Sequence, residues 1–158
     1  MIKDWGELGV DMRPLATVIQ ASNGWVFRTD RESDTTRVIR EGSEWMPDLS
    51  EVFGACSELL PPGYQNRIVL SCVPAGKWIL PHTDDFGEDV HRRSLHCHVP
   101  IVTDPRCLMG YGDSSLHMRA GHLYTMDVTV RHYVVNPSTV DRVHLLFAHF
   151  PHQEDPDG

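Results

Sequence analysis

A succession of short segments rich in β-branched and aromatic residues occupies the chain from residue 67 onward and most constrains its fold. Turn-forming sequences separate these segments, including Gly110/Gly112, Ala120-Gly121 and Asn136-Pro137-Ser138. The candidate strands are Arg67–Pro74, Ser94–Thr103, Cys107–Tyr111, Ser115–Arg119, His122–Asp127, Val130–Asn136 and Arg142–His149. Short strands at close, regular spacing without an intervening helix are typical of an all-β barrel or jelly roll. The sequence therefore predicts a mainly β fold.

One segment ahead of these strands has the period of a helix. Its apolar residues recur every three or four positions and so share one face. They are Leu49, Val52, Phe53, Cys56 and Leu60. Pro47 and Asp48 mark the start of the segment, and the sequence Pro-Pro-Gly at 61–63 ends it. We predict a supporting helix near residues 48–60.

The first part of the chain has weaker patterns. Leu15–Ala21 and Trp25–Phe27 are candidates for a further pair of strands, and the charged segment Thr29–Arg40 for a surface loop or hairpin. A length of 158 residues suits a single domain over 1–158. Its core is expected at about residues 64–151, with flanking strands and loops in 1–47 and a frayed tail in 153–158.

The charge balance limits the partners of the protein. Lys and Arg total 14 against 22 Asp and Glu, a net charge of −8. This balance argues against nucleic acid and against an anionic membrane surface, because both require basic protein surface. No segment approaches the roughly 18 apolar residues of a membrane span, and the N-terminus lacks the apolar core of a signal peptide. We expect a cytoplasmic protein with no nucleic-acid or membrane partner.

All ten histidines of the chain lie from residue 82 onward. The first belongs to His82-Thr83-Asp84, an H-x-D motif expected at the end of a strand, where residues two apart point to the same side. Two imidazoles and one carboxylate on one face leave three coordination positions open, as a non-haem Fe(II) oxygenase requires. The simpler interpretation of the motif alone is a turn aspartate beside a surface histidine.

His132 is the candidate for the second imidazole. It lies in Val130–Asn136, where Val130, Val134 and Asn136 share its face. A histidine on an apolar strand face is more often a core residue than a ligand. The H-x-D motif supplies the other ligands, however, and this favours a metal-binding role.

Arg142 follows ten residues after His132 and begins the next candidate strand. An arginine there can bind a carboxylate through two parallel hydrogen bonds, as a dicarboxylate cosubstrate would require. The alternative is a surface arginine that pairs with Asp141 or another acid.

His96 and His98 share one face of Ser94–Thr103, whereas the other face is apolar and suits packing under the 48–60 helix. The histidine face would then look into the barrel. Two histidines at this spacing are also candidate metal ligands, so a cupin-like, histidine-rich metal site is a competing interpretation. Arg92 and Arg93, in the loop that follows the H-x-D motif, are candidates for recognising a substrate carboxylate, against the simpler interpretation of a solvated charge run.

Five motifs in order carry a resemblance to a known family: His82-Thr-Asp84, His98-Val-Pro-Ile, Gly121-His-Leu-Tyr-Thr-Met-Asp, His132-Tyr-Val-Val-Asn and Arg142-Val-His-Leu. Over about residues 68–150 the chain resembles the aspartyl/asparaginyl β-hydroxylase family of Fe(II)/2-oxoglutarate-dependent dioxygenases. The resemblance implies a double-stranded β-helix of the jelly-roll or cupin-like type. It also implies that Fe(II), 2-oxoglutarate and O2 are the cofactor and cosubstrates.

The resemblance implies roles for particular residues. His82, Asp84 and His132 would bind Fe(II), Arg142 would bind the distal carboxylate of 2-oxoglutarate, and His98 would lie beside that cosubstrate. The family usually has Arg-x-His-Val-Pro-Ile where this chain has His96, which is therefore a departure from the family at the cosubstrate site.

The implied reaction is hydroxylation of an unactivated C–H bond in an aspartyl, asparaginyl or related amino-acid unit, with release of succinate and CO2. The substrate partner would be an amino acid or a peptide. Two alternatives remain: a hydroxylase of free amino acids such as cis-proline hydroxylases, and a non-catalytic sensor of metal or 2-oxoglutarate on the same fold. Nothing in the sequence bears on the oligomeric state.

Overall fold

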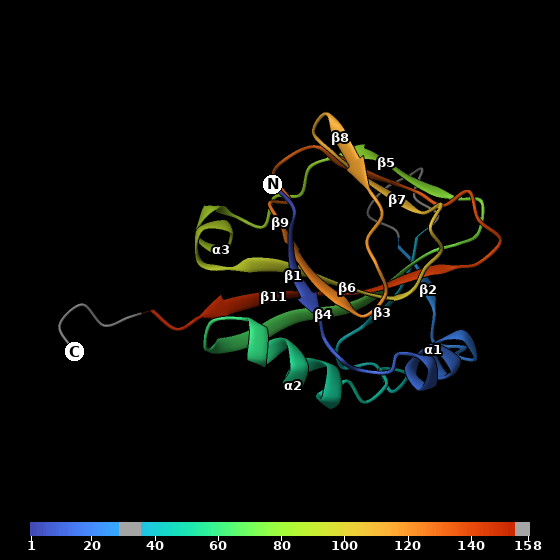
Figure 1. The fold of residues 1–158 in the computed structure, drawn as a ribbon, viewed down its shortest axis with the longest axis horizontal. Helices are drawn as coiled ribbons and strands as arrows, with labels where there is room; N and C mark the ends of the chain where they lie inside the picture. The colour runs from blue at the N-terminus through green and yellow to red at the C-terminus, as the bar shows by residue number, and fades with distance from the viewer. Residues whose placement is uncertain (29–35, 154–158) are drawn as a thin grey trace.

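Two antiparallel β-sheets build the molecule, whose computed structural model describes residues 1–28 and 36–153 (Figure 1). The larger sheet has the order β1 (Lys3–Glu7), β9 (His122–Met126), β6 (Leu95–Val102), β11 (Arg142–Pro151), β4 (Gly63–Val73), β3 (Arg37–Arg40) and β2 (Val26–Phe27). The smaller sheet has the order β5 (Trp78–His82), β10 (His132–Val135), β7 (Leu108–Tyr111) and β8 (Ser114–Leu116). The predicted mainly β, double-stranded β-helix fold is confirmed.

β11 organises the larger sheet because it pairs along most of its length with β4 on one side and β6 on the other. Such a central strand is covered on both faces and tolerates few exposed side chains. Its sequence RVHLLFAHFP is accordingly buried at all but two positions. Arg142 and two histidines are part of this buried strand, so their polar groups require partners inside the protein.

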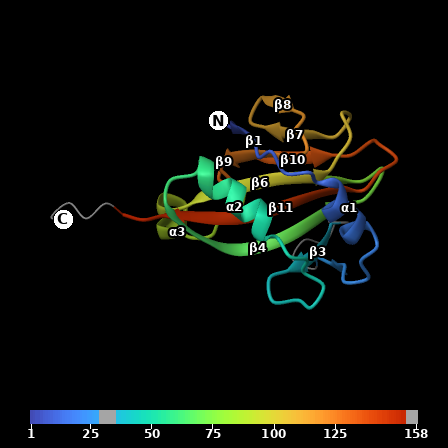
Figure 2. The same cartoon turned by 60° about the horizontal axis from the view of Figure 1, so that its bottom comes forward.

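The predicted helix is present as α2 (Ser50–Leu59). Asp48 shapes its start, since its carboxylate accepts hydrogen bonds from the Ser50 amide (2.9 Å) and hydroxyl (2.6 Å). Val52 and Cys56 are buried in the same cluster as Val99 of β6, so the expected packing of this helix on the apolar face of β6 is confirmed. Figure 2 shows α2 lying across β4, β11 and β6 on the outer side of the larger sheet.

A second apolar cluster lies toward the smaller sheet. It contains residues of both sheets, so the side chains between the two sheets pack against each other and hold each other in place. Its buried members are Val73, Met109, Tyr111, Met118, Tyr124, Met126, Val128 and Val134.

The strand predicted at Leu15–Ala21 is wrong, because this segment is the helix α1 (Arg13–Gln20). Three consecutive β-branched residues at 17–19 favour a strand locally. In the folded protein Pro14 starts a helix, and Leu15 and Ile19, four residues apart, pack on the core from one helical face. Tertiary packing overrides the local preference here.

The other expectations for the first 47 residues are met in part. The strand at Trp25–Phe27 is present as β2, but its partner is β3, with Val26 opposite Val38. Residues 29–35 of the expected loop or hairpin lie outside the described residues. Its last part is β3, with Val38 and Ile39 buried, so this part is not a surface loop. The antiparallel pairing of β3 with β2 agrees with the hairpin alternative.

β5 ends at His82 and is the strand expected ahead of the H-x-D motif, although its start was not predicted. Three further elements differ from the sequence-based expectations. β1 was not among the candidate strands, the loop at 85–93 contains the short helix α3 (Glu88–Arg93), and β8 ends at Leu116, before the expected end at Arg119. The four cysteines are free and buried. Within the described residues, no helix has the length and apolar character needed to span a membrane.

Candidate active site

The pairing of β5 with β10 brings the three predicted metal ligands together. His82 ends β5 and is directly opposite His132, which begins β10. Asp84 follows two residues after His82, and its Oδ2 lies 3.3 Å from Nε2 of His132 and 3.7 Å from Nε2 of His82. Their ligand atoms all lie within 4.8 Å of one another. Two nitrogens and one oxygen therefore converge on one point.

Backbone carbonyls fix the orientation of both imidazoles. Nδ1 of His82 lies 2.7 Å from the oxygen of Leu80, and Nδ1 of His132 lies 2.8 Å from the oxygen of Val130. A carbonyl only accepts, so Nδ1 of each ring carries a proton, and Nε2, the nitrogen on the Asp84 side, is the atom left to bind a metal. This arrangement fits a divalent metal ion, because metal-binding histidines need this tautomer. These residues are the one group in the described part of the chain that could hold a metal, and His96 and His98 do not join it.

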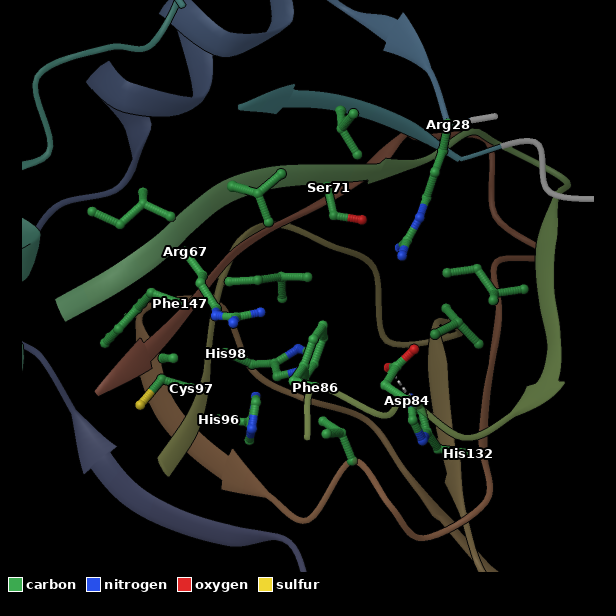
Figure 3. A pocket seen from close by; sticks show the side chains of 18 of the residues that line it. Arg28, Arg67, Ser71, Asp84, Phe86, His96, Cys97, His98, His132 and Phe147 are labelled. Atoms are coloured by element: carbon green, nitrogen blue, oxygen red, sulfur yellow. Dashed lines mark ion pairs between the residues drawn. The ribbon is translucent and has the colours of Figure 1, made fainter. Parts of the chain in front are cut away.

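A cavity of about 420 Å³ opens beside the three ligands, between the two sheets (Figure 3). Its walls come from β3, β4, β6 and β11 on one side and β5, β7 and β10 on the other. The remaining predicted site residues, Arg142, His96 and His98, also line this cavity. The fold thus gathers into one place the predicted site residues, which are up to 60 residues apart in the sequence (142 − 82 = 60).

Arg142, the first residue of β11, is 4% exposed and has no carboxylate within ion-pair distance among the described residues. The expected alternative, pairing with Asp141, is wrong, because that carboxylate instead accepts a hydrogen bond from the Ala75 amide (2.9 Å). Burial lowers the pKa of the Arg142 guanidinium to about 10, so it stays charged at neutral pH. An uncompensated buried cation is costly, and a bound anion would remove that cost.

His144 links Arg142 to His98. Nη2 of Arg142 lies 3.2 Å from Nδ1 of His144, which in turn lies 3.3 Å from Nδ1 of His98. Since a guanidinium only donates, Nδ1 of His144 accepts and the proton of that ring is on Nε2, which has no partner among the described residues. The sequence interpretation missed His144, although its position two residues after Arg142 places both on one strand face.

Both of these histidines are neutral. Burial, reinforced by the charge of Arg142, lowers the pKa of His98 to about 3 and that of His144 well below its ordinary value. Neutral rings add no positive charge beside Arg142. Arg142 is therefore the one charged member of the linked group Arg142, His144 and His98.

A prediction for stability follows from these neutral rings. The unfolded chain takes up protons on both histidines below about pH 6.5, whereas the folded protein does not, so the free energy of unfolding should fall as the pH is lowered from 6.5. The expected slope is up to about 1.4 kcal/mol per pH unit for each histidine. Urea unfolding of the metal-free protein between pH 7 and 4.5 measures it.

A matched pair of variants tests whether His98 contributes to this pH dependence of the free energy of unfolding. His98→Gln should show a smaller loss between pH 6.5 and 4.5, while His152→Gln, at an exposed position, should behave as the wild type. The carboxyls of Asp11 and Asp104 have pKa values lowered to about 2 by their arginine neighbours. Their protonation therefore lowers the free energy of unfolding only below about pH 4. An unchanged slope in His98→Gln would show that this ring is already protonated in the folded protein.

His96 lies on the opposite side of His98 from Arg142, against the ring of Phe86, with centroids 5.3 Å apart. Its Nε2 is buried without a hydrogen-bond partner among the described residues. Arg92 and Arg93 do not line the cavity; they pair with Asp89 across one turn of α3, at 3.6 and 3.2 Å. The interpretation of this segment as a solvated charge run is supported.

A family model described as aspartyl/asparaginyl beta-hydroxylase matches residues 31–151. The chain belongs to this family. The family expected from the sequence motifs is therefore confirmed. No curated protein sequence matches the chain closely enough to add to this assignment.

Solved structures of low sequence identity share the double-stranded β-helix fold of this aspartyl/asparaginyl β-hydroxylase family member. A prolyl-4-hydroxylase from Pseudomonas putida is 16% identical, covering 96% of this chain and 92% of that one, with a TM-score of 0.66. The α-ketoglutarate-dependent epimerase SnoN from nogalamycin biosynthesis is 14% identical, covering 95% and 78%, with a TM-score of 0.66. A collagen prolyl hydroxylase from Paramecium Bursaria Chlorella virus-1 is 7% identical, covering 96% of both chains, with a TM-score of 0.63. At these identities the likeness establishes the fold.

Two of these neighbours were solved with cofactors. The viral prolyl hydroxylase is a complex with 2-oxoglutarate, and SnoN has been solved with Fe3+ and α-ketoglutarate. The hydroxylase family member described here has the fold of these enzymes and a group of three residues suited to a metal.

Proposed function

We propose that the protein is a 2-oxoglutarate-dependent dioxygenase that hydroxylates a C–H bond of an aspartyl, asparaginyl or related amino-acid unit and releases succinate and CO2. One observation carries the proposal: a two-histidine, one-carboxylate group and a buried arginine without a counter-ion line the same cavity. Iron and 2-oxoglutarate are the cofactors of this site, in keeping with the family and the fold. The metal supplies the oxygen activation that protein side chains lack.

The residues divide the binding work between them. His82, Asp84 and His132 hold the metal on one face, and the hydrogen bonds to Leu80 and Val130 keep both rings in the ligating tautomer. Arg142 binds the distal carboxylate of 2-oxoglutarate, which supplies the negative charge that this buried cation lacks. The metal ligands and the arginine together would then orient the cosubstrate at both ends.

The two histidines of β6 complete the cosubstrate side of the cavity. His98 lies beside 2-oxoglutarate. His144, on the neighbouring strand β11, accepts a hydrogen bond from Arg142 through Nδ1 and contacts His98, so it helps to position the guanidinium. His96 contributes the next part of the wall with Phe86. The apolar remainder of the lining, including Val134 and Leu146, excludes bulk water from the reacting atoms.

A succinate-release screen tests the proposal. The protein is supplied with Fe(II), ascorbate, 2-oxoglutarate and O2, and offered free amino acids and peptides that contain Asp, Asn or Pro. Proline belongs in the panel because two neighbours of the same fold are prolyl hydroxylases. We expect at least one substrate to raise succinate release well above the substrate-free rate, with a product heavier by one oxygen atom.

The pattern of stimulation separates the alternatives. Stimulation by free amino acids alone would identify a free amino-acid hydroxylase. Tight binding of 2-oxoglutarate without succinate release from any member of the panel would identify a sensor and contradict the enzymatic proposal.

A further inference from the structure

β4 contains a bulge at the cavity. Between the pairs Val69–Leu146 and Asn66–Ala148, β4 has two residues, Arg67 and Ile68, where β11 has only Phe147. Arg67 has a φ of 56°, and it is the one non-glycine residue with positive φ among the described residues. Glycine normally takes this position in a bulge, because a side chain there is strained. An arginine in this place points to a requirement for its side chain.

The bulge directs Arg67 into the cavity. Arg67, Val69 and Ser71, at alternate positions of β4, all line it, and Figure 3 shows the guanidinium of Arg67 turned toward the centre of the pocket. The Asn66 side chain secures the bulge by accepting a hydrogen bond from the Arg67 amide (2.7 Å). Arg67 makes no ion pair with any carboxylate in the described part of the chain.

Phe86 connects this arginine to the metal site. The guanidinium carbon of Arg67 lies 5.1 Å from the centre of the Phe86 ring, which also packs against the rings of His96 and His91. Phe86 follows Asp84 by two residues, so the same short segment supplies a metal ligand and the ring beneath the arginine. The stack holds the planar guanidinium in place and leaves its edge open to a ligand.

Arg67 and Arg142 serve different ends of the cavity. Arg142 lies opposite Val73, six residues along β4 from Arg67 (73 − 67 = 6), which is about 20 Å at about 3.3 Å per residue. Arg142 is buried, whereas Arg67 is exposed at the mouth. A 2-oxoglutarate molecule held by the metal and Arg142 would leave Arg67 without a partner.

We propose that Arg67 binds a carboxylate of the substrate and so selects an anionic substrate class. This inference rests on the proposed function, since it assigns the second anion site to the molecule that is hydroxylated. The chain carries a net charge of −8, which disfavours anionic ligands in general. An unneutralised arginine at the mouth of the cavity provides the local attraction that such a substrate needs.

Binding of matched ligand pairs tests the proposal independently of turnover. The pairs are L-aspartate with L-asparagine, N-acetyl-Ala-Asp-Ala-amide with its Asn counterpart, and L-proline with L-prolinamide. Calorimetry on protein loaded with Zn(II) and 2-oxoglutarate measures each affinity. We expect the wild type to prefer the carboxylate member of at least one pair by about tenfold or more, as loss of a charge-assisted hydrogen bond implies.

Two variants complete the binding test. Arg67→Gln should reduce that preference to within about threefold, while Arg119→Gln, at an exposed position away from the cavity, should retain it. The proposal is overturned if the wild type binds no carboxylate member, shows no preference, or if Arg67→Gln keeps the preference. A preference that depends on Arg67 without any succinate release would contradict the proposed reaction and leave the anion site standing.

The strain at Arg67 has its own test. At an ordinary strand position alanine is more stable than glycine, but at positive φ the order reverses. Arg67→Gly should therefore have a higher Tm than Arg67→Ala, by about 2 to 4 °C for a chain of this size, and both should lose the carboxylate preference. A higher Tm for the alanine variant would show an unstrained backbone and remove the argument that the arginine is retained for its side chain.

Discussion

Replacing His132 with alanine is expected to abolish formation of the metal–cosubstrate complex. In the wild type under anaerobic conditions, Fe(II) and 2-oxoglutarate together should produce a visible charge-transfer band. His132→Ala removes one of the two nitrogens that converge on Asp84. We expect loss of the band and a fall in metal affinity of at least about 100-fold, because even changes to the groups that orient metal ligands cost 10- to 100-fold.

Two controls make this result specific. His152→Ala removes an exposed histidine from the end of the chain and should leave the band intact. Circular dichroism of the metal-free His132→Ala protein should show the wild-type fold. Its Tm should fall, because the buried ring packs on His82 (ring centroids 4.3 Å apart) and hydrogen-bonds to Val130, so folding is checked by the spectrum and by a cooperative unfolding transition. A wild type without any band, or a band that survives in His132→Ala, would contradict the assignment of these ligands.

Arg142→Met should have two opposite effects. The cation is buried without a counter-ion in the cosubstrate-free protein, so an apolar side chain of similar length should raise the free energy of unfolding, by about 1 to 4 kcal/mol. The same change removes the partner of the distal carboxylate, so the Kd for 2-oxoglutarate should rise by about 100-fold or more. Urea unfolding and anaerobic titration of the charge-transfer band measure the two quantities.

The metal provides the internal control for Arg142→Met. Metal affinity without 2-oxoglutarate should stay within about threefold of the wild type, because Arg142 contacts His144 and no metal ligand. Arg119→Met, at an exposed position, should alter neither stability nor cosubstrate binding. Equal losses of metal and cosubstrate binding in Arg142→Met would point to a general disturbance of the cavity and would remove the proposed role of this arginine.

Together the two variants separate the ends of the cosubstrate site. His132→Ala should leave a protein that still presents the Arg142 cation, and Arg142→Met should leave one that still binds metal. Arg67 belongs to neither set, since it lies about 20 Å along β4 from the position opposite Arg142. Loss of substrate preference in an Arg67 variant that retains the charge-transfer band would therefore locate substrate binding at the mouth of the cavity.

Local patterns account for the parts of this molecule that could be predicted. Side chains of a strand point alternately to its two faces, and side chains three or four residues apart in a helix share one face. The order of the residues alone therefore predicts α2, the central strands β6 and β11, and the shared face of His96 and His98. The H-x-D motif at the end of β5 also depends only on residues two apart. The same local reasoning failed at α1, where three β-branched residues favour a strand but contacts with the core stabilise a helix.

The tertiary structure decided which side chains meet through the pairing of strands. The register of β5 against β10 places His132 opposite His82, and no local pattern specifies that register. The contact of His144 with His98 requires β11 and β6 to lie side by side. Arg67 enters the cavity because β11 has one residue fewer than β4 at the bulge. The sequence by itself determined which residues can bind metal and anions; pairing between strands distant in sequence decided where they meet, since the energy of such contacts depends on the whole fold.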